Sequence, residues 1–174
     1  MSQIRIALDC DGVICNFGAG VVKRAKELGI EFLEHEKDWP CWDGHENFSK
    51  IMKQAWTDPE FWLNLEPLNT ISFTPYCYIT SRQIPSEITE QWLEKNNFPK
   101  AKVITVKRPE DKIQHLKDEN IDLLIDDLHS TVRSAIDAGI SAFLFVAPYQ
   151  RGHELECKGL PRLWDLKHLE GLVC

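Results

Sequence analysis

Two aspartates, one residue apart, follow the first apolar run of this 174-residue chain. Residues 4–8 predict a buried strand, and Asp9 and Asp11 come directly after it, followed by Gly12. In an extended chain, residues i and i+2 point to the same face, so the two carboxylates would project together. Like charges held this close favour a cation or a proton between them. The pair therefore indicates a site for a hard divalent cation with oxygen ligands.

Three later apolar runs also end in polar residues. The run 75–79 is followed by Thr80, Ser81 and Arg82, the run 102–106 by Lys107, and the run 121–125 by Asp126 and Asp127. The carboxyl ends of parallel strands meet at one edge of a sheet, and ligands bind there. We therefore expect these side chains to converge with those of Asp9 and Asp11.

The elements that must position these residues alternate between strands and helices. Apolar patterns predict strands at 4–8, 75–79, 102–106, 121–125 and 142–146, and helices at 17–28, 85–96, 110–117 and 130–138. In the helix at 17–28 we expect Val21, Val22, Ala25 and Leu28 to point inward, and a last helix is expected around Leu163, Trp164, Leu166 and Leu169. This alternation predicts an α/β fold with a doubly wound, Rossmann-like, parallel five-stranded sheet.

The composition of the chain changes between the first predicted strand and the second. Residues 31–66 are rich in charge and hold four of the six tryptophans, Trp39, Trp42, Trp56 and Trp62. Helices are expected at 48–56 and from Asp58-Pro59 to Trp62. So much aromatic surface predicts a packed unit rather than a linker. We expect a small helical cap at 16–67, inserted into an α/β core made of 1–15 and 68–174.

Charge and composition exclude several classes of function. The net charge of −7, from 20 basic and 27 acidic residues, argues against binding of duplex nucleic acid. No stretch reads as a signal peptide or as a membrane span, and the six cysteines show no zinc-ligand spacing. A cytoplasmic, reduced protein is expected. The aromatic residues of the insert permit a homodimer.

The predicted cluster suits phosphoryl transfer. Carboxylates from two strands can hold Mg²⁺, while a hydroxyl and a lysine hold the phosphoryl oxygens. One carboxylate can act as the nucleophile and form an aspartyl-phosphate that water then hydrolyses. A second carboxylate, two residues on, can protonate the leaving oxygen and later take a proton from water.

The same residues carry a resemblance to the haloacid dehalogenase (HAD) superfamily of phosphatases. Residues 8–13 resemble its first motif, Ile79-Thr80 its second, Asp111-Lys112 its third and residues 124–127 its fourth. The resemblance implies that Asp9 is the nucleophile and Asp11 the general acid/base. It implies phosphate binding by Thr80, Ser81 and Lys112, the last preferred over Lys107. Mg²⁺ would be held by Asp9, Asp126 and the backbone carbonyl of Asp11, with Asp127 either a direct ligand or one step removed.

Within that superfamily the chain is similar to the 5′(3′)-deoxyribonucleotidase branch and its bacterial and phage relatives. The matching pieces are Asp9-x-Asp11-Gly12-Val13 with Phe17, the segment 59–67, Thr80-Ser81, residues 124–127, and Pro148-Tyr149. The resemblance implies a nucleoside monophosphate as substrate, with Phe17 and an insert tryptophan such as Trp62 against the base. Arg82 is expected either to bind substrate or to pair with a carboxylate.

Three other functions stay open. The chain could be a phosphatase for another small phosphorylated metabolite, because the pocket of the cap decides the substrate. A receiver domain also uses acidic residues, threonine and lysine on a parallel sheet, but the early Asp-x-Asp and the helical insert fit it poorly. A non-catalytic phosphate-binding module is the third alternative.

Overall fold

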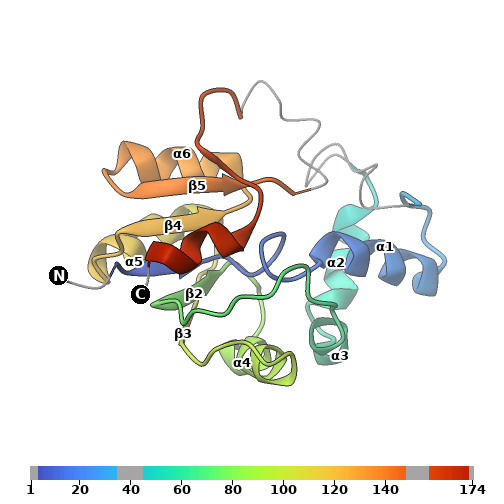
Figure 1. The fold of residues 1–174 in the computed structure, drawn as a ribbon. Helices are drawn as coiled ribbons and strands as arrows, with labels where there is room; N and C mark the ends of the chain where they lie inside the picture. Colours follow the sequence, from blue (N-terminus) through green and yellow to red (C-terminus); the bar gives the residue numbers. More distant parts are fainter. Residues whose placement is uncertain (1–3, 35–44, 148–156, 173–174) are drawn as a thin grey trace.

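A computed structural model describes residues 4–34, 45–147 and 157–172. Six parallel strands form one sheet in the order β3-β2-β1-β4-β5-β6 (Figure 1). The strands are β1 (Ile6–Leu8), β2 (Cys77–Thr80), β3 (Lys102–Thr105), β4 (Leu123–Asp126), β5 (Ser141–Phe145) and β6 (Arg162–Leu163). The chain winds outward from β1 to β3 and then returns to build the other half. The predicted doubly wound parallel sheet is confirmed.

The prediction of five strands is wrong, because the tail adds a sixth. Strand β6 is two residues long and pairs with β5 through Leu144↔Arg162 and Phe145↔Leu163. Two residues are too few to show the alternation that marks a strand. The predicted last helix also begins later than expected. A 3-10 helix, η4 (Leu166–Leu172), begins at Leu166, whereas Leu163 lies in β6 and Trp164 is 67% exposed.

The sheet is covered on both faces. Helix α4 (Ser86–Lys95) lies on one side, while α5 (Lys112–Asp118) and α6 (His129–Asp137) cover the other; Figure 1 shows α4 and α6 on opposite sides. In β1, the side chains of Ile6 and Leu8 belong to the apolar cluster on the α4 side of the sheet, and that of Ala7 belongs to the cluster on the side of α5 and α6. Successive strand residues point to opposite faces, and this strand is buried on both. No helix of the described ranges is long and apolar enough to cross a membrane.

A helical insertion follows β1, as predicted. It contains α1 (Phe17–Leu28), α2 (Phe48–Ala55) and α3 (Pro59–Leu63), which Figure 1 shows grouped beside the sheet. Helix α1 ends at Gly29, which takes the left-handed conformation (φ 63°) that favours glycine. The expected inward face of α1 is buried except for Leu28, which is 38% exposed.

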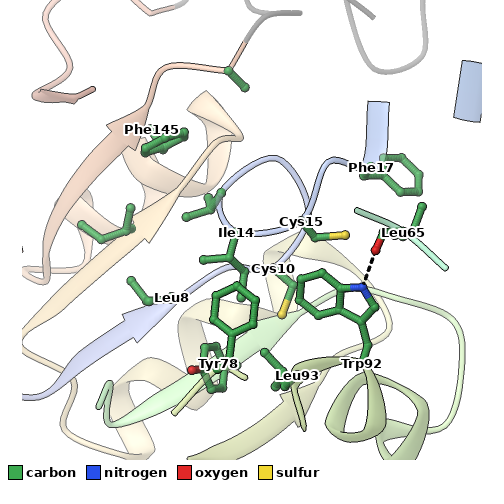
Figure 2. Packing of buried hydrophobic residues seen from close by; sticks show 14 of the residues in the cluster. Leu8, Cys10, Ile14, Cys15, Phe17, Leu65, Tyr78, Trp92, Leu93 and Phe145 are labelled. Carbon is green, nitrogen blue, oxygen red and sulfur yellow. Dashed lines mark hydrogen bonds between the residues drawn. The ribbon is translucent and has the colours of Figure 1, made fainter. Parts of the chain in front are cut away.

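One continuous apolar core joins the insertion to the sheet. Trp92 of α4 is fully buried, and its Nε1–H donates a 2.8 Å hydrogen bond to the carbonyl of Leu65, which follows α3 (Figure 2). Cys10, Ile14 and Phe17 lie in the same cluster. The insertion is therefore held against the carboxyl ends of the strands.

Candidate active site

The residues predicted from the strand ends gather around one cavity of about 470 Å³. Its lining includes Asp9, Asp11, Thr80, Ser81, Arg82, Lys107, Lys112 and Asp127, together with Phe17 and Trp62 of the insertion. Asp126 lies behind this lining and is fully buried. The topology thus brings together side chains that are more than a hundred residues apart in the sequence.

A tight loop turns Asp9 and Asp11 into the cavity. Strand β1 ends at Leu8, and the backbone N–H of Cys15 donates to the carbonyl of Cys10 at 2.8 Å. Gly12 has φ 77°, a conformation that side chains with a Cβ rarely adopt. The glycine after the two aspartates therefore permits the turn that separates the strand from α1.

Three carboxylates form a cluster beneath the cavity. Among the residues that the structure describes, Asp9, Asp126 and Asp127 offer oxygens that lie within 4.8 Å of one another. Strand alternation favours opposite directions for Asp126 and Asp127, but β4 ends at Asp126, so Asp127 is free of that alternation. The carboxylate of Asp11 is directed elsewhere and accepts hydrogen bonds from Arg82.

Lys112 is the cation of this cluster. Its Nζ lies 2.7 Å from Oδ2 of Asp126 and 3.1 Å from Oδ1 of Asp9, and the lysine side chain is 2% exposed. Oδ1 of Asp126 accepts a 2.8 Å hydrogen bond from the backbone N–H of Leu128. The lysine stands at the first residue of α5, at the sequence position expected for it, whereas Lys107 lies exposed at the rim of the cavity.

The cluster holds three acidic groups and one basic group. Burial raises the pKa of Asp9 from 3.8 to about 7; Lys112 opposes this rise, and Asp126 and Asp11 add to it. Burial, Asp9 and Asp126 also raise the pKa of Asp127 well above its ordinary value. A single ammonium thus faces three buried carboxylates. Buried oxygen ligands with uncompensated negative charge fit a hard divalent cation such as Mg²⁺.

Thr80 presents an unused hydroxyl at the same edge. It is 1% exposed, and its Oγ1 has no hydrogen-bond partner among the described residues. A buried hydroxyl without a partner costs free energy. Ser81 follows it on the cavity wall. Both residues line the cavity, where their hydroxyl groups can donate hydrogen bonds to phosphoryl oxygens.

Arg82 lies against Asp11. Its guanidinium donates from Nε to Oδ2 of Asp11 at 2.9 Å and from Nη2 to Oδ1 at 2.7 Å. Of the two roles expected for this arginine, pairing with a carboxylate is the one seen. Burial opposes its charge, but Asp11, together with Cys15 and Cys10, outweighs burial and raises the pKa of Arg82.

The aromatic wall of the cavity differs from the one expected. Trp62 is 2% exposed, stacks on Phe17 with ring centroids 5.8 Å apart, and donates from Nε1 to the carbonyl of Ala55. The residues that the sequence analysis missed are Phe48 and Met52 of α2. Together with Trp56, an insert tryptophan that directly follows this helix, they line the cavity at four-residue intervals. That helical spacing was the available signal. Trp56 is 37% exposed.

Some expected site residues fall outside the described ranges. Trp39, Trp42, Pro148 and Tyr149 lie there.

No model of a protein family matches the chain, and no curated protein does. Several solved structures are similar to the chain. A HAD-superfamily hydrolase of subfamily IA from Geobacter sulfurreducens is 15% identical with a TM-score of 0.60, over 98% of this chain and 100% of that one. A HAD family hydrolase from Deinococcus radiodurans with bound phosphate and sodium is 11% identical with a TM-score of 0.63, over 98% and 97%.

A third similar structure is a candidate phosphoglycolate phosphatase from Lactobacillus plantarum. It is 16% identical with a TM-score of 0.63, over 99% of this chain and 100% of that one. At sequence identities this low, the similarity shows a shared fold and does not identify a substrate. The chain therefore has the fold of the HAD-superfamily hydrolases, with a buried aspartate cluster at the carboxyl ends of its strands.

Proposed function

We propose that this chain is a Mg²⁺-dependent phosphomonoester hydrolase that forms an aspartyl-phosphate on Asp9, and that its substrate is a nucleoside monophosphate. The observation that carries the proposal is the cluster of Asp9, Asp126 and Asp127 around Lys112, next to the unused hydroxyl of Thr80. This set brings together, at one cavity, a nucleophile, ligands for a cation and hydrogen-bond donors for a phosphoryl group.

The proposed reaction has two steps. A carboxylate oxygen of Asp9 attacks phosphorus, the bond from phosphorus to the leaving oxygen breaks, and Asp11 gives that oxygen a proton. Water then attacks the phosphorus of the aspartyl-phosphate and gives one proton to Asp11, while the bond from phosphorus to the Asp9 oxygen breaks. This step releases inorganic phosphate and restores the carboxylate of Asp9 and the proton of Asp11. The hydroxyls of Thr80 and Ser81 donate to the phosphoryl oxygens.

Mg²⁺ held by Asp9, Asp126 and Asp127 would neutralise charge on the phosphoryl oxygens. Lys112 adds a fixed positive charge, and its contacts with Asp9 and Asp126 keep both carboxylates oriented. Burial of the cluster strengthens these electrostatic interactions.

The nucleotide specificity rests on the apolar wall of the cavity. Phe48, Met52 and Trp56 offer a surface for a flat leaving group, and Trp56 is exposed enough to stack on a base. A phosphatase for another small metabolite is the alternative, and the candidate phosphoglycolate phosphatase among the similar structures makes 2-phosphoglycolate the first such compound to test.

The test is phosphate release from nucleoside monophosphates, 2-phosphoglycolate and p-nitrophenyl phosphate, with Mg²⁺ or with EDTA. The expected result is Mg²⁺-dependent release that Asp9→Asn abolishes, fastest for a nucleoside monophosphate. A preference for 2-phosphoglycolate would overturn the proposed nucleotide substrate but would agree with the proposed aspartyl-phosphate mechanism. Equal release by wild type and Asp9→Asn would overturn the nucleophile, and no release by wild type from any compound would favour a non-catalytic module.

A further inference from the structure

Arg82 is sealed inside the protein although it borders the cavity. Its side chain is 0% exposed, and that of its partner Asp11 is 14% exposed. Besides the two donors directed at Asp11, Nη1 donates to Oγ1 of Thr89 in α4 at 3.3 Å. The guanidinium is therefore held from the far side as well as by the carboxylate.

Two tryptophans cover the guanidinium. Its central carbon lies 5.1 Å from the ring centroid of Trp62 and 5.6 Å from that of Trp92. Each ring is itself fixed, because its Nε1–H donates a 2.8 Å hydrogen bond to a backbone carbonyl. The acceptor is the carbonyl of Ala55 for Trp62 and that of Leu65 for Trp92, and Figure 2 shows the second of these bonds. The guanidinium is thus sandwiched between α3 of the insertion and α4 of the core.

This geometry leaves Asp11 little freedom to rotate. Two parallel N–H donors of a planar guanidinium fix both the position and the plane of a carboxylate, which a lysine ammonium cannot do. A carboxylate has about four lone-pair sites, so Asp11 keeps acceptor capacity for a proton on the side that faces the cavity.

We propose that Arg82 is a positioning residue that acts on the substrate only through Asp11, holding its carboxyl group where the leaving oxygen departs. The proposal rests on the proposed function, since it gives Asp11 the proton-donor role assumed there. It replaces direct substrate binding by Arg82, because the donors that would reach a phosphate are directed at Asp11 and Thr89.

The dependence on the leaving group distinguishes this role from a structural one. An alkoxide must be protonated as it leaves, whereas p-nitrophenolate leaves readily without a proton. Misplacing Asp11 should therefore slow hydrolysis of alkyl phosphates far more than hydrolysis of p-nitrophenyl phosphate. A general loss of structure would slow both alike, and lost substrate binding would raise KM for both.

The experiment measures kcat/KM for p-nitrophenyl phosphate and for the alkyl phosphate that wild type hydrolyses fastest. Arg82→Lys is the main variant, and Thr89→Val, which removes only the outer hydrogen bond, is a milder second. Arg24→Lys is the matched control: Arg24 pairs with Asp58 and lies over Phe61, so it too joins a carboxylate and a ring, outside the cavity.

We expect Arg82→Lys to lower kcat/KM for the alkyl phosphate about tenfold or more beyond its effect on the aryl phosphate, because general acid catalysis contributes about 10²–10⁴-fold. Thr89→Val should also lower kcat/KM more for the alkyl phosphate than for the aryl phosphate, by a smaller factor. Arg24→Lys should show no such difference between the two esters. Equal losses on both esters, or a rise in KM alone, would overturn the positioning role. A wild type inactive on every ester would instead overturn the proposed function, and this proposal with it.

Discussion

The Nζ of Lys112 lies 2.7 Å from Oδ2 of Asp126, and both side chains are buried, 2% and 0% exposed. The contact joins the first residue of α5 to the last residue of β4. Burial opposes the charge on Lys112, but Asp126 and Asp9 outweigh it and raise the lysine pKa. The lysine therefore keeps its charge at neutral pH and offsets part of the negative charge around it.

Lys112→Met should destabilise the metal-free protein strongly. Removing one partner of a buried ion pair leaves uncompensated charge and costs about 3–5 kcal/mol. Urea unfolding in EDTA measures the loss, and Lys107→Met, which removes an exposed lysine from the same cavity, is the control and should change little. If both variants unfold at the same urea concentration as wild type, the lysine does not balance the cluster.

Asp9→Asn should stabilise the metal-free protein at high pH and not at low pH. Folding raises the pKa of Asp9 from 3.8 to about 7, so the folded state holds a proton that the unfolded state has lost between these values. Stability from this group therefore falls as pH rises through that window.

The advantage of Asp9→Asn over wild type should grow by on the order of 4 kcal/mol from pH 4 to pH 8, at 1.36 kcal/mol per pKa unit. Urea unfolding at several pH values in EDTA gives this difference directly. An advantage that stays constant with pH would contradict the raised pKa of Asp9.

Mg²⁺ alone should raise the thermal midpoint of wild type, since an ion that binds the folded state stabilises it by mass action. Asp127→Asn removes one oxygen ligand of the buried cluster and should weaken this response. Asp118→Asn is the control, because Asp118 is exposed at the end of α5. The same Mg²⁺ dependence in all three proteins would exclude Asp127 from the cation site.

Thr80→Val should separate activity from stability. The swap keeps the shape and removes a buried hydroxyl without a partner, so the free energy of unfolding should stay equal or rise slightly. Phosphate release should fall about tenfold, as expected for one lost hydrogen bond of about 1.4 kcal/mol.

Thr131→Val provides the matched control, because Thr131 in α6 also has a buried Oγ1 without a hydrogen-bond partner among the described residues, and it does not line the cavity. That variant should keep its stability and its full rate. A Thr80→Val protein as active as Thr131→Val would show that the Thr80 hydroxyl does not bind the phosphoryl group.

Trp56→Ala should raise KM for nucleoside monophosphates about tenfold or more, since base stacking on an aromatic ring is worth about 1–3 kcal/mol. Esters without a ring should be hydrolysed as by wild type. Steady-state kinetics on both classes tests this, with Trp164→Ala, an exposed tryptophan outside the cavity lining, as the control. An unchanged KM would remove Trp56 from the substrate site.

Local pattern was enough to predict most of the fold. Helix α1 has the bounds that its apolar spacing and Gly29 predicted, and Pro59 begins α3 as expected. The two-residue strand β6 was missed because its pairing with β5 comes from the finished sheet and from no pattern of its own.

The same holds for the site. Polar residues at strand ends could be identified from the sequence, because a parallel sheet must bring those ends to one edge. The sequence could not determine which charges pair, since the choice of Asp11 for Arg82 and of Asp126 for Lys112 depends on distances across elements. It likewise could not tell a buried tryptophan from an exposed one. Trp62 and Trp56 both line the cavity, and only packing against Phe17 and Arg82 decided that Trp62 is buried while Trp56 is 37% exposed.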